Sequence, residues 1–111
     1  MEDIELIEKL KSGDSETFRL DVEKYQKLVL NCAYKFLRNR ESAEDITQEV
    51  FIEVFESIRS FKAQSQLSTW IYRIAVTKSL NHIKSLKRKK RFAMVVSLFS
   101  EDKSVNIAAH E

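Results

Sequence analysis

The sequence predicts an all-α fold, a compact four-helix domain followed by a C-terminal linker tail. The chain has one glycine and no proline, and its apolar residues recur at three- and four-residue spacings. Its 111 residues are enough for one domain. Folds rich in strands need turn residues at every hairpin, and Gly13 alone cannot supply them. We therefore expect helices joined by short polar breaks.

The first predicted helix covers residues 3–11, and the second follows Asp14 or Ser15 and runs to about Leu37 or Arg38. Gly13 follows the first helix and suits the left-handed conformation that closes a helix. Asp14 or Ser15 offers a side-chain oxygen to cap the second helix. The apolar stripe of this second helix consists of Phe18, Val22, Tyr25, Leu28, Val29, Cys32, Ala33, Phe36 and Leu37.

The third predicted helix covers about residues 43–60, after Glu41 or Ser42, and the fourth runs from a cap at Ser68 to about Phe92. The side chains expected to face the core are Ile46, Val50, Phe51, Val54, Phe55 and Ile58 in the third helix, and Ile71, Ile74, Ala75, Leu80, Ile83 and Leu86 in the fourth. Residues 1–92 would then form the helical domain, and residues 93–111 an interdomain linker or a truncated end. Periodicity leaves open whether the apolar run 93–99 is helix or strand.

Charge is divided sharply along the chain. Residues 1–56 carry 14 acidic and 8 basic side chains, residues 57–100 carry 10 basic and no acidic ones, and residues 101–111 carry 3 acidic and 1 basic. A region without carboxylates suits a polyanion or an anionic membrane surface, and an acidic helix suits a basic protein surface. The sequence therefore indicates two partners of opposite charge.

The fourth helix combines cations with neighbouring aromatic and amide side chains. A basic run at residues 87–91 alone is equally consistent with a solvated helix end. Phe61 and Trp70 lie where the basic region begins, next to Gln64 and Gln66, and such groups can stack on unpaired bases and contact base edges. Taken singly, each ring is more typical of a partly buried core residue. Together these residues favour a single-strand binding site.

Other chemistries are not expected. Cys32 lies on an apolar stripe, where burial as a small hydrophobic residue is favoured, and it has no metal-ligand spacing with His82 or His110. No nucleophile with a base, and no glycine-rich phosphate loop, can be assembled, so we expect no enzymatic activity, cofactor, metal or small-molecule substrate. The amino terminus is acidic and no apolar run is long enough to span a bilayer, which predicts a cytoplasmic protein.

Two strings in the chain carry a family resemblance. Residues 43–51 (AEDITQEVF) and 67–75 (LSTWIYRIA), with the basic run after them, resemble region 2 of bacterial sigma factors of the extracytoplasmic-function type. The resemblance covers about residues 3–92 and implies a transcription initiation factor domain. Its partners would be core RNA polymerase, the non-template strand of the promoter −10 element and, as a further candidate, an anti-sigma factor.

The resemblance also implies roles for particular residues. The acidic third helix would dock on the clamp helices of the polymerase β′ subunit, and the loop of residues 62–68 with the next helix would capture a base turned out of the −10 duplex. The polymerase-binding positions would be Asp45, Gln48, Glu49, Ile52 and Glu53. The DNA-binding positions would be Phe61, Lys62, Ala63, Gln64, Ser65, Gln66, Trp70, Arg73, Thr77, Lys78, Asn81, Lys84 and Arg88.

The chain departs from the family pattern at three points. Ala63 replaces a frequent glycine, Thr77 replaces a frequent asparagine, and the second helical domain that binds the −35 element is missing, so we expect a fragment. Two alternatives stay open. One is a peripheral membrane or partner-binding module that uses the basic helix and the run 93–99, and the other is a nonspecific nucleic-acid-binding protein.

Overall fold

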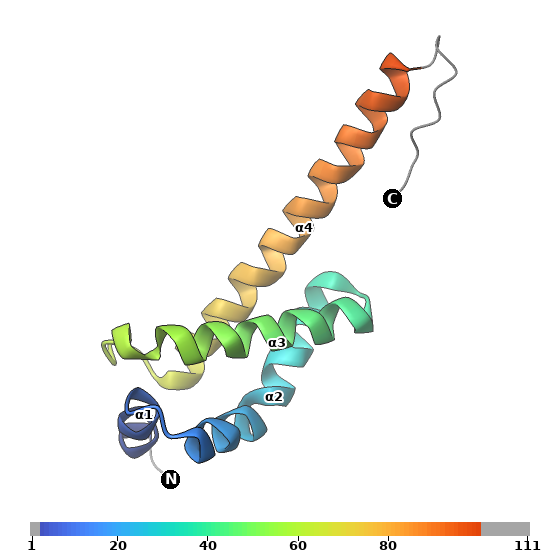
Figure 1. Ribbon diagram of the computed structural model, residues 1–111. Coiled ribbons are helices and arrows are strands. Elements are labelled where there is room, and N and C mark those ends of the chain that lie inside the picture. Colours follow the sequence, from blue (N-terminus) through green and yellow to red (C-terminus); the bar gives the residue numbers. More distant parts are fainter. Residues whose placement is uncertain (1–2, 101–111) are drawn as a thin grey trace. The chain divides into compact units, whose positions relative to one another are not determined.

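The computed structural model describes residues 3–100, and all regular secondary structure in this range is helical (Figure 1). The all-α prediction is therefore confirmed. The elements are α1 (Asp3–Lys11), α2 (Ser15–Leu37), α3 (Arg40–Ser57), the short 3-10 helix η1 (Ile58–Ser60) and α4 (Leu67–Phe99). Within the described residues the chain divides into two compact units, residues 3–80 and residues 81–100, with the boundary inside α4.

The first two helices have the predicted bounds. Gly13 adopts a φ of 84°, which closes α1 without a Cβ clash. Asp14 has an extended backbone and occupies the N-cap position of α2, but its side chain makes no capping bond to the helix backbone, so that expectation was wrong. Its carboxylate instead accepts the hydroxyl of Thr17. At the other end, Arg38 takes a left-handed φ of 54° and donates its N–H to the carbonyl oxygen of Tyr34, so α2 ends without a glycine.

The third helix starts earlier than predicted. Its N-cap is Asn39, whose side-chain oxygen accepts the N–H of Ser42 at 2.9 Å, so Arg40 and Glu41 belong to the first turn. The expected start at about residue 43, after Glu41 or Ser42, was therefore wrong by about one turn. Residues 58–60 tighten into η1 rather than continuing the α-helix.

The fourth helix is longer than predicted at both ends. It starts at Leu67, which places Ser68 inside the first turn rather than at the cap, and it runs through Phe99 rather than ending near Phe92. No glycine or proline interrupts residues 67–99, and Ala93, Met94 and Leu98 are good helix formers. The polar tail at 101–111, including His110, lies outside the described residues.

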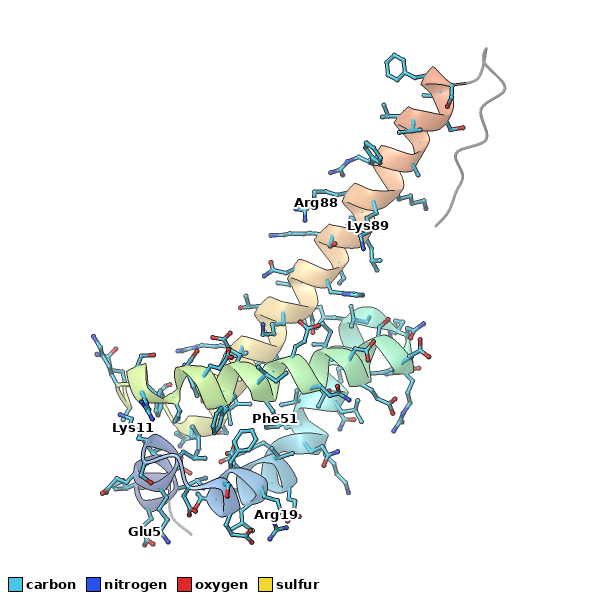
Figure 2. The ribbon with its side chains drawn as sticks, viewed as in Figure 1. Glu5, Lys11, Arg19, Phe51, Arg88 and Lys89 are labelled. Carbon is cyan, nitrogen blue, oxygen red and sulfur yellow. The ribbon has the colours of Figure 1, made fainter. Side chains whose placement is uncertain are left out.

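The core of the first unit is formed by α1, α2, α3, η1 and the start of α4. Figure 1 shows α3 crossing α2, and in Figure 2 the ring of Phe51 extends from α3 toward α2. Among the residues of α2, α3 and α4, the fully buried apolar side chains are Val29, Ala33, Ala43, Val50, Val54, Leu67, Ile71 and Ala75. Cys32 is buried as predicted.

Several predicted core residues lie outside this core. Phe55 is 51% exposed, because the buried stripe of α3 follows the four-residue steps of Val50 and Val54, and its ring instead makes an edge contact with Phe18. Leu28, Phe36 and Leu80 are exposed in the first unit, and Leu86 is exposed in the second. In α2 the buried stripe includes Thr17 and Asp21 instead. Across residues 3–100, no helix is both long and apolar enough to cross a membrane.

Candidate functional site

The exposed side of α3 forms an acidic face, made of Asp45, Gln48, Glu49, Ile52 and Glu53. The core stripe of α3 turns these positions away from α2. Ile52 is 56% exposed and gives the face an apolar contact point between its carboxylates. Four of the five residues are exposed, so the face can meet a basic partner without any rearrangement of the helix.

Glu53 differs from the other members of the acidic face. One of its carboxylate oxygens accepts the hydroxyl of Ser57, and the other lies 3.8 Å from Nζ of Lys78 in α4. Glu53 and Lys78 were predicted to serve different partners, and the structure pairs them with each other. The pair joins the acidic face to the basic stripe of α4 and leaves both side chains partly buried.

The segment that joins η1 to α4, residues 61–66, is here termed the α3–α4 loop. Lys62, Ala63, Gln64 and Gln66 are exposed, and Ser65 is half-buried. Ala63 has a φ of 56°, in the left-handed region where a side chain is strained and glycine is not. The loop therefore follows the backbone path expected of a glycine, although alanine occupies the position.

Phe61 is the first residue of the α3–α4 loop, Trp70 lies in the first turn of α4, and the two rings are in contact. Their ring centroids are 4.9 Å apart, with planes inclined by 33°. Phe61 is only 5% exposed, whereas Trp70 is half-buried. Phe61 thus packs in the core beneath Trp70, and Trp70 is the ring with a surface open to solvent.

The basic stripe of α4 occupies one side of the helix in the first unit, with Arg73 and Thr77 exposed and Lys78 half-buried. In the second unit Asn81, Lys84 and Arg88 recur at three- and four-residue spacings, and all three are exposed. Arg88 and Lys89 extend from different sides of the helix in Figure 2. No acidic side chain occurs between residues 57 and 100, so every charged side chain that this segment contributes, in either unit, is basic.

Two residues of α1 contact the ends of the α3–α4 loop. The Nζ of Lys11 donates to the carbonyl oxygen of Phe61 at 2.6 Å, and Oδ2 of Asp3 accepts the N–H of Leu67 at 3.4 Å. Sequence reasoning missed both residues. Their partners lie 50 and 64 positions away, and a lysine or aspartate at the end of a short helix is explained equally well by the helix dipole.

Asp21 is a buried charge on α2. Its side chain is fully buried, and within residues 3–100 neither carboxylate oxygen has a hydrogen-bond partner. Burial raises the pKa of Asp21 from 3.8 to about 6; nearby Lys24 opposes the shift and Asp3 adds to it. The burial of Asp21 was not predictable from the sequence, because an aspartate on an amphipathic helix is usually on the solvent side.

Comparison with known proteins connects these surfaces to one family. The family model of sigma-70 region 2 matches residues 22–89. The chain is 34% identical to RNA polymerase sigma-H factor of Pseudomonas aeruginosa over 79% of its own length and 46% of the relative. It is 37% identical to ECF RNA polymerase sigma factor SigW of Bacillus subtilis, over 73% of this chain and 43% of that one.

A solved structure has a similar fold. It is the NMR structure of an engineered region 2 of sigmaE in complex with GTAAAA, which matches with a TM-score of 0.74 and 31% identity over 80% of this chain and 93% of that chain. The chain spans about half the length of the curated relatives it matches. On the family match and the shared fold, the chain belongs to the sigma-70 region 2 family.

Proposed function

We propose that this chain is a transcription initiation factor domain that binds core RNA polymerase and recognises and melts the promoter −10 element. The acidic face of α3 is the polymerase-binding surface, and the α3–α4 loop with the basic stripe of α4 binds the non-template strand. The domain acts in the cytoplasm and catalyses no reaction itself, because the polymerase carries out the chemistry.

The exposure of the acidic face supports polymerase binding. A row of free carboxylates with one amide and one apolar side chain suits a coiled coil rich in arginine and lysine, such as the β′ clamp helices that the family resemblance implies. Asp45 and Glu49 are the central contacts of this proposal. Glu53 contributes less to polymerase binding, because its carboxylate already has Ser57 and Lys78 as partners.

One observation carries the DNA-binding proposal. The α3–α4 loop and the start of α4 contain no acidic residue, and they include Trp70, which is half-buried and packs on the ring of Phe61. A solvent-facing indole can stack on an unpaired base, and the lysines and arginines can neutralise phosphates. The similar engineered region 2 of sigmaE was solved in complex with GTAAAA. This likeness supports the same class of ligand here.

The proposed mechanism is capture of an opened base. Unstacking a base costs a few kcal/mol, so stacking on Trp70 and contacts in the α3–α4 loop must offset that cost. Arg73 and Lys78 would hold the backbone, with Asn81, Lys84 and Arg88 as further contacts. Thr77 has one hydroxyl at a position where the family resemblance implies a frequent amide, so we expect a different base preference there.

Two binding measurements on the full chain test the proposal. The first is pull-down of bacterial core RNA polymerase freed of its own sigma factors. The second is selection from a random single-stranded hexamer pool, followed by fluorescence anisotropy of the selected and scrambled sequences. Binding to polymerase together with a preference for the selected hexamer supports the proposal. Equal binding to all hexamers without polymerase binding would instead indicate a nonspecific nucleic-acid-binding protein.

A second candidate function rests on the second unit. Phe92, Met94, Leu98 and Phe99 are exposed apolar residues that follow the basic run 87–91, as in helices that lie on anionic membranes. Flotation with phosphatidylserine vesicles tests this reading. Strong vesicle binding by a chain that does not bind polymerase would favour the membrane module over the initiation factor.

A further inference from the structure

Helix α1 lies before the region matched by the family model, yet it is fixed firmly to the core. The matched region starts at residue 22, and α1 ends at Lys11. Leu6 and Leu10 are buried on the inner side of the helix. The middle of α1 is thereby anchored, and its first and last residues, Asp3 and Lys11, remain available for contacts elsewhere.

Those two residues contact opposite ends of the α3–α4 loop. Lys11 donates to the carbonyl oxygen of Phe61 at 2.6 Å, a short charge-assisted bond, and Figure 2 shows Lys11 at the end of α1. Asp3 accepts the N–H of Leu67 at 3.4 Å. Leu67 is the first residue of α4, where an N–H has no partner within the helix, and Leu67 is buried. Asp3 therefore supplies an acceptor that water cannot.

The length of α1 sets the spacing between these two contacts. From Asp3 to Lys11 the helix rises about 12 Å at about 1.5 Å per residue. Between the contacts the loop contains Ala63 in a left-handed conformation, which costs about 1–2 kcal/mol and persists only when surrounding structure holds it. A rigid helix that fixes both ends of the loop provides such support.

We infer that α1 is a positioning element for DNA recognition, in which Lys11 and Asp3 hold the two ends of the α3–α4 loop so that it is preformed for a captured base. This inference rests on the proposed function of the loop. Neither residue needs to touch DNA. Their effect is on the conformation of residues 61–67, and through it on discrimination between bases.

Paired substitutions in the full chain separate this role from charge and from helix stability. Lys11→Met and Asp3→Ala remove the two contacts. Lys9→Met and Glu5→Ala are the controls, because they remove the same charges from the same helix ends at exposed positions. Lys11→Arg keeps a charged donor and should restore the contact.

The first readout is the ratio of the dissociation constants for a scrambled hexamer and for the hexamer selected by the wild-type chain. We expect Lys11→Met and Asp3→Ala to reduce this ratio by about three- to tenfold, with near-wild-type values for both controls and for Lys11→Arg. Equal losses in Lys11→Met and Lys9→Met would mean that only charge matters, and would overturn the inference.

The second readout needs no DNA. Amide hydrogen exchange of residues 62–67 should become faster in Lys11→Met and Asp3→Ala but not in the controls, while exchange in the middle of α3 stays unchanged. Unchanged loop exchange in both variants would overturn the inference even if DNA binding is established. Loss of protection in the loop of a chain that binds no hexamer would instead support the bracing contact while refuting the proposed function.

Discussion

The acidic face of α3 and the α3–α4 loop lie on consecutive segments but are built differently. The acidic face is one side of a regular helix, so its members are exposed as soon as the core stripe of Val50 and Val54 is buried. The loop has no such regularity. Its shape depends on the left-handed Ala63 and on contacts from Asp3 and Lys11 in a distant helix. A helical surface is thus locally determined, whereas a loop surface depends on tertiary structure.

The largest expected effect comes from reversing charge on the acidic face. Asp45→Lys combined with Glu49→Lys should weaken binding of core polymerase on the order of a thousandfold, because each new lysine would face a basic partner. Both positions are exposed, so the melting temperature should change little. Polymerase binding is measured by surface plasmon resonance.

The same double variant tests whether the two surfaces are independent. Its affinity for the selected hexamer should equal that of the wild-type chain. The control is Glu44→Lys combined with Glu56→Lys, which reverses two other exposed carboxylates of α3. An equal loss of polymerase binding in that matched pair would show that net charge, rather than the acidic face, determines docking.

Trp70 tests the loop surface directly. Trp70→Ala should weaken hexamer binding by about 1–3 kcal/mol through lost stacking. It should also lower the melting temperature, because the indole packs on Phe61. Trp70→Phe keeps an aromatic face and should retain most of the affinity. Anisotropy and thermal unfolding of both variants separate the two contributions, and a lower melting temperature with unchanged affinity would place Trp70 in the core only.

Asp21 makes the stability of the first unit depend on pH. Its folded-state pKa of about 6 lies above the ordinary value of 3.8, so the folded chain favours the protonated carboxyl. The contribution of this carboxyl to the free energy of unfolding is fully present below pH 3.8 and is lost as the pH rises through about 6. Asp21→Asn should therefore stabilise the chain by about 3 kcal/mol at pH 8 and by little at pH 4.

Urea unfolding at both pH values measures the effect of Asp21→Asn. Glu23→Gln, at an exposed position of the same helix, is the control. An equal increase in the free energy of unfolding for Asp21→Asn at pH 4 and at pH 8 would show that the Asp21 carboxyl titrates normally in the wild-type folded chain.

A smaller effect is expected from the strained backbone of the loop. Ala63→Gly should stabilise the chain by about 0.5–1 kcal/mol, since relief of left-handed strain exceeds the added entropy of the unfolded chain.

Gly13→Ala is the reverse experiment. A Cβ at Gly13 meets no atom within 4 Å, so the loss of about 1 kcal/mol expected there reflects backbone strain alone. Changes of the same sign in both variants would contradict this explanation.

The smallest expected effect concerns one phosphate contact. Lys84→Ala should weaken all hexamers about equally and reduce the salt dependence of binding by about 0.7 in log K against log salt, the share of one phosphate on a single strand. Titrations from low to moderate salt measure the slope. An altered base preference with an unchanged slope would contradict a backbone role for Lys84.

Regular features were predictable from the sequence and long-range ones were not. The helical periodicity predicted α1 and α2 and the exposure of Asp45 and Glu49, because these follow from local geometry. It missed the Asn39 cap, since several polar residues there could have served. It also missed Asp21, Lys11 and Asp3, whose burial or contacts depend on how distant helices pack.

The most direct test of two separate surfaces is a titration of the isotopically labelled chain with the selected hexamer, followed by NMR chemical shifts. We expect shift changes in the α3–α4 loop and along the basic stripe of α4, at Trp70 and Arg73 above all, with none at Asp45 or Glu49. Shift changes centred on the acidic face, or spread evenly over all helices, would contradict this expectation.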